Sequence, residues 1–310
     1  MRRELLAGIR TIVSHAGCPD GFASALILRH VLPEAEVVFV QHSTPEYAAL
    51  PATPGMLFCD IVPPAARAEA FRKAGALVLD HHRGARDLVA SFGERGVFAD
   101  ETVEPRVSGA SLAFREVWTC LAEGDVAQAR PKVETFARRA GIRDTWQRDD
   151  PEWDEACAQA AALLFFGDEP LQDRPWLDDA QMSVGRRLVA QGRARAQAIA
   201  RDRLFRLRPD VVVYDDRDGT VSDVAQAAFD LHPTVKLVAG FHHEVTSDGQ
   251  MLLVFSLRSR PGGTDVAALA QRMGGGGHRA AAGFGRAVTL DSPNPLATLK
   301  GLVESSEVSA

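Results

Sequence analysis

The sequence predicts an α/β protein of two domains, the first built on a mostly parallel β-sheet. Short apolar runs alternate with helical stretches in the first half of the chain, and a second alternation of this kind follows residue 206. Strands that alternate with helices are typical of a mostly parallel sheet. The chain has 310 residues, 46% of them hydrophobic, which is enough for two domains with separate cores.

Four apolar runs give the predicted strands of the first domain, at residues 11–14, 36–40, 56–59 and 76–79. Helices are expected at residues 21–31 and 65–73, where Ala, Leu and Arg recur at helical spacing. From Ser108 the chain reads as mainly helical up to about Arg206. Residues 178–206 have few helix breakers, which predicts a helix that connects the two domains. Gly185 and Gly192 weaken this prediction, because glycine is unfavourable inside a helix.

The second α/β region has predicted strands at residues 210–214, 235–241 and 251–257. A helix at residues 264–273 and a run of four glycines at 274–277 follow them. We therefore predict a first domain at residues 1–185, a linker helix at 186–206, and a smaller domain at 207–310.

The charge and cysteine content exclude several classes of protein. With a net charge of −6, the chain has no excess of basic residues to bind a long duplex nucleic acid. A small anionic substrate is still compatible with this charge, because a bound metal ion can supply the positive charge that holds it. The four cysteines form no CxxC pair, and the N-terminus has no long apolar region. No stretch of about 18 apolar residues exists, so we expect a cytoplasmic protein without a membrane partner.

Possible metal ligands follow each of three predicted strands in the first domain. Ligands bind at the carboxyl ends of the strands in open parallel sheets, so these residues are expected at one edge. They are His15 with Asp20 in the next loop, Asp60, and the consecutive Asp80, His81 and His82.

This mixture of imidazole and carboxylate suits manganese, iron or zinc. Two such ions about 3.5–4 Å apart can hold both the attacking and the leaving oxygen of a phosphoryl transfer. A carboxylate must bridge the two ions, and Asp60 is the candidate for that role. A single strand-end Asp is more often a cap or a turn former, so the prediction depends on the whole set.

Several motifs together resemble the DHH phosphoesterase family over nearly the whole chain. Leu-Asp-His-His at residues 79–82 resembles the signature that names the family, and residues 14–21 resemble its first motif. Asp60 and Asp144 resemble its second and fourth motifs. The glycine-rich stretch at residues 274–284 resembles the hallmark of the associated C-terminal domain, DHHA1. The order and spacing of these motifs carry the resemblance, because the tripeptide alone is weak.

The resemblance implies a DHH domain with a binuclear manganese site, and an active site in the cleft between that domain and DHHA1. One ion would be held by His15 and Asp60. The other would be held by Asp20, Asp60, His81 and Asp144. His82 would face the phosphate as a catalytic residue, and Asp80 would orient the neighbouring histidines. Water activated by the two cations would attack phosphorus in line, without a covalent enzyme intermediate.

Cys18 is a departure from the family pattern, because many members carry an Asp at that place. Cys18 is either a thiolate ligand or a small packed residue beside the site. A thiolate would favour Zn²⁺ or Fe²⁺ over Mn²⁺.

The resemblance also implies that the second domain grips the nucleotide or phosphate end of the substrate. Backbone N–H groups in a glycine run can approach an anion closely. The implied substrate-binding residues are Arg258, Gly275, Gly276, Gly277 and His278.

The leading prediction is a hydrolase of phosphodiesters in short oligonucleotides or linear dinucleotides. Alternatives are a phosphomonoesterase of the phosphoadenosine phosphate type and a cyclic dinucleotide phosphodiesterase. An alternative of another class is a nucleotide-binding sensor whose metal site has decayed, with Cys18 as the sign of it. A homodimer is compatible with the sequence, which does not determine the number of subunits.

Overall fold

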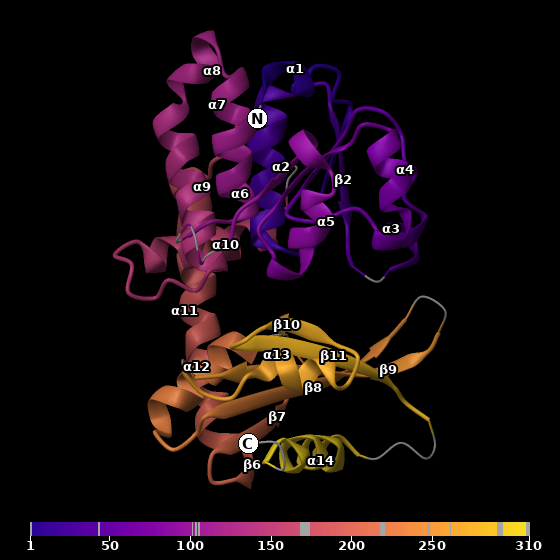
Figure 1. Cartoon of the computed structure of the whole chain (residues 1–310). Helices are drawn as coiled ribbons and strands as arrows, with labels where there is room; N and C mark the ends of the chain where they lie inside the picture. The colour runs from indigo at the N-terminus through magenta and orange to yellow at the C-terminus, as the bar shows by residue number, and fades with distance from the viewer. Residues whose placement is uncertain are drawn as a thin grey trace. The chain divides into compact units, whose positions relative to one another are not determined.

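The computed structural model describes residues 2–42, 44–100, 102, 104, 106–167, 174–217, 221–246, 249–260, 262–289 and 294–307. Contacts divide the chain into two units, Met1–Val189 and Ala190–Ala310, coloured indigo to salmon and salmon to yellow in Figure 1. The boundary falls inside one helix, so the predicted linker at residues 186–206 is shared between the two units.

The first unit contains a five-stranded sheet in the order β2-β1-β3-β4-β5, with every pair parallel. The parallel sheet predicted from the sequence is therefore confirmed. Its strands are β1 (Thr11–His15), β2 (Glu36–Val40), β3 (Met56–Cys59), β4 (Leu77–Asp80) and β5 (Gly96–Phe98). The last of these was not predicted, because three residues are too few to show a periodic pattern.

The helices of the first unit include short 3₁₀ turns and one π-helical segment. The α-helices are α1 (Arg3–Leu6), α2 (Pro19–Val31), α3 (Pro45–Ala49), α4 (Ala68–Lys73), α5 (Arg86–Ala90), α6 (Gly109–Leu112), α7 (Thr119–Leu121), α8 (Gly124–Gln128), α9 (Arg130–Asp144) and α10 (Trp153–Phe166). The 3₁₀ turns are η1 (Ala65–Arg67), η2 (Arg83–Ala85) and η3 (Gly93–Arg95), and the π-helical segment is η4 (Ala113–Trp118).

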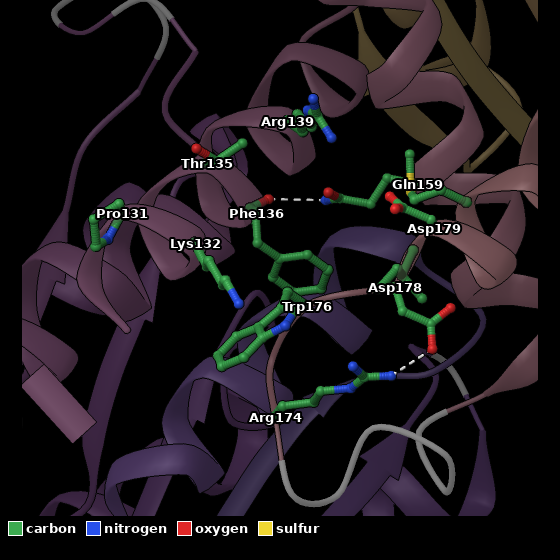
Figure 2. A pocket seen from close by; sticks show the side chains of 12 residues that line it. Pro131, Lys132, Thr135, Phe136, Arg139, Gln159, Arg174, Trp176, Asp178 and Asp179 are labelled. Carbon is green, nitrogen blue, oxygen red and sulfur yellow. Dashed lines mark hydrogen bonds and ion pairs between the residues drawn. The ribbon is translucent and has the colours of Figure 1, made fainter. Parts of the chain in front are cut away.

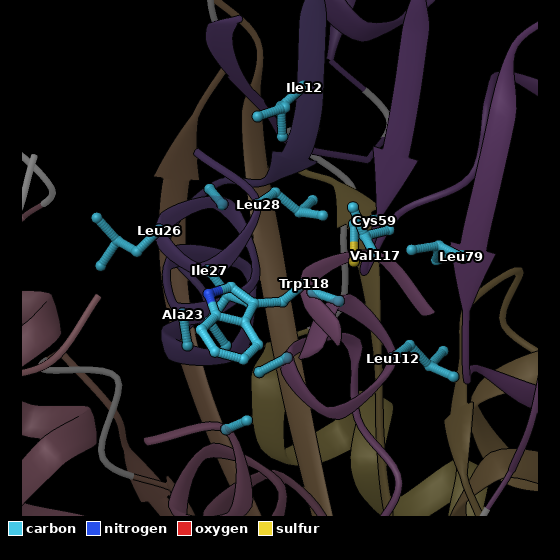
Figure 3. Close-up of a cluster of buried hydrophobic side chains, with 14 of the residues drawn as sticks. Ile12, Ala23, Leu26, Ile27, Leu28, Cys59, Leu79, Leu112, Val117 and Trp118 are labelled. Atoms are coloured by element: carbon cyan, nitrogen blue, oxygen red, sulfur yellow. The ribbon is translucent and has the colours of Figure 1, made fainter. Parts of the chain in front are cut away.

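Successive residues of the strands in this sheet are buried on opposite faces. Ile12 packs in a cluster with residues of α2 and α6 and with the fully buried Trp118 of η4, as Figure 3 shows. Its neighbour Val13 packs in a second cluster with Phe58 and Phe71. Burying each large apolar side chain contributes roughly 1.5–3 kcal/mol. Because both faces are covered, the strands consist of continuous apolar runs whose first polar residues come at the strand ends.

The second unit contains a six-stranded mixed sheet in the order β10-β11-β9-β8-β7-β6, in which β7 and β8 are parallel. The strands are β6 (Phe205–Arg208), β7 (Val211–Asp215), β8 (Leu237–Val245), β9 (Met251–Ser259), β10 (Gly276–His278) and β11 (Ala281–Ala287). The helices are α12 (Val221–Leu231), α13 (Val266–Gln271) and α14 (Pro295–Glu307). One face of this sheet packs with α13 and α14, and the other packs with α12 and the end of α11 (Asp179–Asp202).

Two predicted elements differ from the structure, the connecting helix and the glycine run. The connecting helix ends at Asp202 and not at Arg206, because Arg206 belongs to strand β6. Gly185 lies inside that helix without breaking it. A Cβ atom there would lie 2.0 Å from the carbonyl oxygen of Ala158, so the glycine permits close packing against α10. The glycine run is partly a strand, since Gly276 begins β10.

Within the described residues, no helix is both long and apolar enough to span a membrane.

Candidate metal centre

The candidate ligands lie at the carboxyl edge of the parallel sheet. His15 is the last residue of β1, Asp60 directly follows β3, and His81 and His82 directly follow β4. Neighbouring parallel strands end at the same edge of a sheet, so three segments far apart in the sequence deliver polar side chains to one place.

Asp60 lies at the middle of this cluster and is held in an unusual backbone conformation. Its φ angle is 64°, its exposed fraction is 1%, and its N–H donates to the carbonyl oxygen of Leu79 at 3.1 Å. One carboxylate oxygen, Oδ1, lies 3.0 Å from Nε2 of His81, and the other, Oδ2, lies 3.7 Å from Nδ1 of His15. The two oxygens therefore face two different imidazoles.

Asp20 comes from the first turn of α2 and is buried against the start of α6. Its carboxylate accepts hydrogen bonds from the backbone N–H groups of Gly109 at 2.6 Å and Ala110 at 3.1 Å. A Cβ atom at position 109 would lie 2.5 Å from Cβ of Asp60 and 2.7 Å from Oγ of Ser24. Glycine is therefore needed at this position, which the sequence analysis assigned no role in the site.

His81 lies among three carboxylates. Its Nε2 atom is 3.0 Å from Asp60, 3.6 Å from Asp144 and 3.8 Å from Asp20. Asp144 is the last residue of α9, and its side chain is 26% exposed, so this ligand lies on the open side of the cluster.

The pKa values of His81, Asp60 and Asp20 are shifted by burial and by the charges of their neighbours. Burial acts to lower the pKa of His81, but the hydrogen bond to Asp60 and the charges of Asp144 and Asp20 raise it to about 10. Burial acts to raise the pKa of Asp60, but the imidazoles of His15 and His81 hold it below its usual value. Burial and then the charges of Asp60 and Asp144 raise the pKa of Asp20 well above its usual value. The cluster thus concentrates negative charge that a cation would balance.

Cys18 precedes the first residue of α2 and lies at the same edge. The ligand atoms of His15, Cys18 and Asp60 all lie within 4.8 Å of one another. Burial, followed by the charge of Asp60, raises the pKa of the Cys18 thiol well above its usual value. The geometry allows a sulfur ligand here, but a thiolate would need a cation beside it.

The donor set fits divalent metal ions. Besides the group with Cys18, two further groups of ligand atoms lie within 4.8 Å of one another, namely Asp60, His81 and His82, and Asp20, His81 and Asp144. Nδ1 of His15 and Oδ2 of Asp60 are buried without a hydrogen-bond partner. A buried polar atom without a partner costs roughly 1–3 kcal/mol, and a metal ion would satisfy both of these atoms.

His82 is turned toward Asp80. The backbone N–H of His82 donates to Oδ1 of Asp80 at 2.7 Å, and its Nδ1 atom lies 3.0 Å from the same oxygen. Asp80 is 1% exposed, whereas the His82 side chain is 35% exposed. Asp80 therefore fixes the orientation of the outer, partly exposed histidine.

His42 is a neighbour of the cluster that the sequence analysis missed. Its ring centroid lies 5.5 Å from that of His15 and 5.2 Å from that of Tyr47. Burial and the nearby His15 and His82 lower the pKa of His42. The signal was present in the sequence, because His42 follows strand β2 by two residues.

A cavity of about 200 Å³ adjoins two of the candidate ligands, Asp20 and Asp144. Its other lining residues come mainly from α9 and α10 and include Arg143 and Gln159. Trp146 does not line it. That ring packs against Trp153 with centroids 5.1 Å apart, and the Arg143 guanidinium lies 4.4 Å from its centroid.

Comparison with known proteins gives no match to a protein-family model or to a curated protein. Solved structures do match. RecJ from Thermus thermophilus, solved in complex with Mn²⁺, aligns with a TM-score of 0.58 and 18% identity, over 99% of this chain and 53% of RecJ. The DHH domain of a member of the s1p family of ribosomal proteins aligns with a TM-score of 0.58 and 11% identity, over 99% and 88% of the two chains.

An exopolyphosphatase-related protein from Bacteroides fragilis aligns with a TM-score of 0.54 and 12% identity, over 97% of this chain and 93% of that protein. The chain has the DHH fold. At these identities the likeness concerns the fold alone, and a shared fold does not determine the chemistry of a site.

In the second unit, the predicted substrate-binding residues Gly276, Gly277 and His278 lie on β10, and Arg258 lies on β9, with β11 between the two strands. The register aligns His278 of β10 with Ala281 of β11, and Ala281 with Arg258 of β9. The Arg258 guanidinium donates from Nε to Oγ of Ser222 at 3.0 Å. The side chain of His278 lies outside the described part of the chain.

The glycines of the run have unequal surroundings. A Cβ atom at Gly275 would lie 2.1 Å from the carbonyl oxygen of Gly283, and one at Gly277 would lie 2.6 Å from that of Ala281. Nothing lies within 4 Å of the corresponding point at Gly276. Close strand packing therefore accounts for Gly275 and Gly277, whereas Gly276 has open space and no positive φ angle.

Proposed function

We propose that this chain is a metal-dependent phosphoesterase of the DHH type that hydrolyses phosphodiester bonds in short oligonucleotides or linear dinucleotides. The observation that carries the proposal is the position of Asp60. Its two carboxylate oxygens face His15 on one side and His81 on the other. This is the arrangement that a bridging carboxylate between two cations requires.

Two divalent cations would divide the donors between them. One would be held by His15, Cys18 and Asp60, and the other by Asp60 together with the group of Asp20, His81 and Asp144. When bound, the cations would supply Lewis acidity that activates water and offsets charge on the phosphoryl oxygens. The fold shared with RecJ, which was solved with Mn²⁺, supports manganese as the first metal to test.

The residues of the chain itself hold and orient the reacting groups. The buried Asp20 is fixed by two backbone N–H groups, so its carboxylate keeps its direction when an ion binds. Asp80 accepts from Nδ1 of His82 and so orients the ring, which in its imidazolium form can donate to a phosphoryl oxygen. A preoriented donor of this kind stabilises the charge that develops on phosphate oxygens.

Two features support a small substrate. The net charge of −6 provides no general basic surface for a long duplex. The residues that resemble the DHHA1 hallmark would hold the far end of a short nucleotide, and Arg258 lies on the strand next but one to them.

The experiment is hydrolysis of a substrate panel by purified protein, first stripped with a chelator and then supplied with Mn²⁺. The panel contains dinucleotides, short RNAs, cyclic dinucleotides, 3′-phosphoadenosine 5′-phosphate and bis(p-nitrophenyl) phosphate, with products separated by chromatography. We expect metal-dependent cleavage of the linear dinucleotides and short RNAs. Cleavage of the phosphomonoester alone would replace the proposed substrate class, and nucleotide binding without any cleavage would indicate the sensor.

A further inference from the structure

A second cavity, of about 460 Å³, lies in the first unit between α9 and the segment that leads into α11 (Figure 2). Pockets for small molecules have volumes of roughly 300–1,000 Å³. None of the candidate metal ligands lines this cavity. The lining residues that matter here are Lys132, Thr135, Phe136, Arg139, Gln159 and Trp176.

Lys132 brings a positive charge to the cavity next to an aromatic ring. Its Nζ atom lies 5.0 Å from the ring centroid of Trp176, within cation–π range. Among the described residues, no carboxylate lies within ion-pair distance of Lys132. Its charge is therefore available to an anion.

Arg139 is the second cation, and its carboxylate partners are already engaged by other arginines. Its Nε lies 3.3 Å from Glu152 and its Nη1 lies 3.8 Å from Glu155. Arg138 binds the same Glu152 at 2.6 and 2.9 Å, and Arg186 binds the same Glu155 at 2.7 and 2.8 Å. Three guanidinium groups share these two carboxylates, and Arg139 has the longest contacts to them.

The acidic residues of the lining have cations beside them. Asp178 accepts a hydrogen bond from Arg174 at 2.7 Å, as Figure 2 shows, and also accepts one from the backbone N–H of Gln181. Asp179 lies in the electrostatic field of Arg186. Neither carboxylate therefore cancels the charges of Lys132 and Arg139.

The remaining walls suit a planar ring with polar edges. Trp176 is half-buried, with its indole fixed by an edge contact to His30 at 6.0 Å between centroids. Gln159 is 3% exposed, and its amide donates to the carbonyl oxygen of Phe136 at 2.8 Å, which holds the amide in one orientation. An aromatic ring in the wall of a cavity offers a face on which a base can stack.

We propose that this cavity is a binding site for a nucleoside monophosphate, with the phosphate at Lys132 and Arg139 and the base against Trp176. A guanidinium and an ammonium that line the same cavity are suited to a phosphate dianion. The aromatic wall distinguishes this site from a site for inorganic phosphate. The proposal is argued from the lining residues and does not depend on the hydrolytic activity proposed above.

The two cavities of the first unit are neighbours, because Gln159 lines both. A nucleoside monophosphate could also bind as a product at the candidate metal centre, so binding has to be assigned to one site by variants. Titration calorimetry with AMP as the probe, in the presence of a chelator, measures binding without turnover.

We expect saturable AMP binding by the full chain, and affinities lower by about tenfold or more for adenosine, ribose 5-phosphate and inorganic phosphate. Lys132→Ala and Arg139→Ala should each weaken AMP binding by about tenfold or more, because each removes a charge-assisted contact. Lys73→Ala, which removes an exposed lysine paired with Glu69, is the matched control and should bind AMP like the wild type.

Two results would overturn the site. One is the absence of saturable AMP binding at millimolar concentration by the folded wild type. The other is AMP binding that Lys132→Ala and Arg139→Ala leave unchanged and that His82→Ala removes, which would assign AMP to the metal centre. Because chelated protein is used throughout, failure of this site and failure of the proposed hydrolysis give different results.

Discussion

The carboxyl edge of the parallel sheet and the glycine run of the second unit were both predicted to be functional, yet they have different physical character. At the sheet edge, His15 and Asp60 each keep a buried polar atom without a hydrogen bond. In the glycine run, Gly275 and Gly277 approach neighbouring backbone so closely that the sheet itself requires them.

This comparison teaches how to weigh two kinds of motif. Unsatisfied buried polar atoms cost free energy of folding, roughly 1–3 kcal/mol each, and a bound ion would remove that cost. Glycines that permit close strand packing already have a structural explanation. The catalytic assignment at the sheet edge therefore has stronger support than the substrate assignment at the glycine run.

The largest expected effect comes from removing the charge that would bridge the two cations. Asp60→Asn should lower kcat by about 1,000-fold or more, because losing a bridging ligand removes several kcal/mol of charge stabilisation. Asparagine tolerates the positive φ of 64° at this position better than alanine does, so the variant should stay folded. Elemental analysis should show fewer bound ions per chain. Wild-type turnover after chelation and readdition of metal would contradict the two-metal mechanism.

The next effect separates the two histidines of the signature. His82→Ala should lower kcat by about 100-fold while metal content stays near that of the wild type, because His82 is assigned to the phosphate. His81→Ala should lose metal, since Nε2 of His81 lies within 3.8 Å of three carboxylates. Metal content and kcat are measured on both variants. Equal loss of metal in the two variants would show that the assigned roles are wrong.

Much of the sheet edge could be predicted from the sequence because local pattern and topology act together there. The apolar runs define the strands, parallel strands end at one edge, and each run is followed by His or Asp. His42 follows the same rule after β2 and was missed because no family motif marks it. Gly109 could not be predicted, because its role depends on the distance between two segments that are 49 residues apart in sequence, at Asp60 and at the start of α6.

The glycine run was harder to interpret from the sequence. A glycine indicates that the backbone has conformational freedom at that position, but it does not show what the freedom is used for. Four successive glycines predicted a loop around an anion, whereas Gly276 and Gly277 belong to a strand paired with β11. The partner residues 281–283 are close in sequence, but the stretch of Gly and Ala on both sides of the hairpin has no apolar alternation that would predict strands.

The glycine run itself can be tested with a matched pair of positions. Gly275→Ala should destabilise the second unit, by about 1–3 kcal/mol, because its Cβ would lie 2.1 Å from backbone. Gly276→Val has open space and should fold with an unchanged Tm. If the run holds the far end of the substrate, Gly276→Val should lower kcat/KM about tenfold for a dinucleotide and much less for bis(p-nitrophenyl) phosphate. Equal losses of kcat/KM on both substrates would show that the glycine run does not bind the far end of the substrate.

The smallest expected effect concerns Cys18, the place where the sheet edge departs from the family pattern. Cys18→Asp replaces sulfur by oxygen in a group whose ligand atoms lie within 4.8 Å of one another. Hard oxygen ligands suit Mn²⁺ better than Zn²⁺, so the variant should keep activity within a few-fold and shift its metal preference toward Mn²⁺.

Metal preference is measured as kcat/KM with Mn²⁺ and with Zn²⁺ for wild type, Cys18→Asp and Cys18→Ser, together with metal content. Serine keeps the size of the side chain but is a weaker ligand than thiolate, so it controls for packing. If sulfur binds an ion, the ratio of Mn²⁺ to Zn²⁺ activity should rise from the wild type to Cys18→Asp. An unchanged ratio in both variants would leave Cys18 as a packed residue beside the ions. The metal at His15 would then be held by fewer protein ligands, and water would have to complete its coordination.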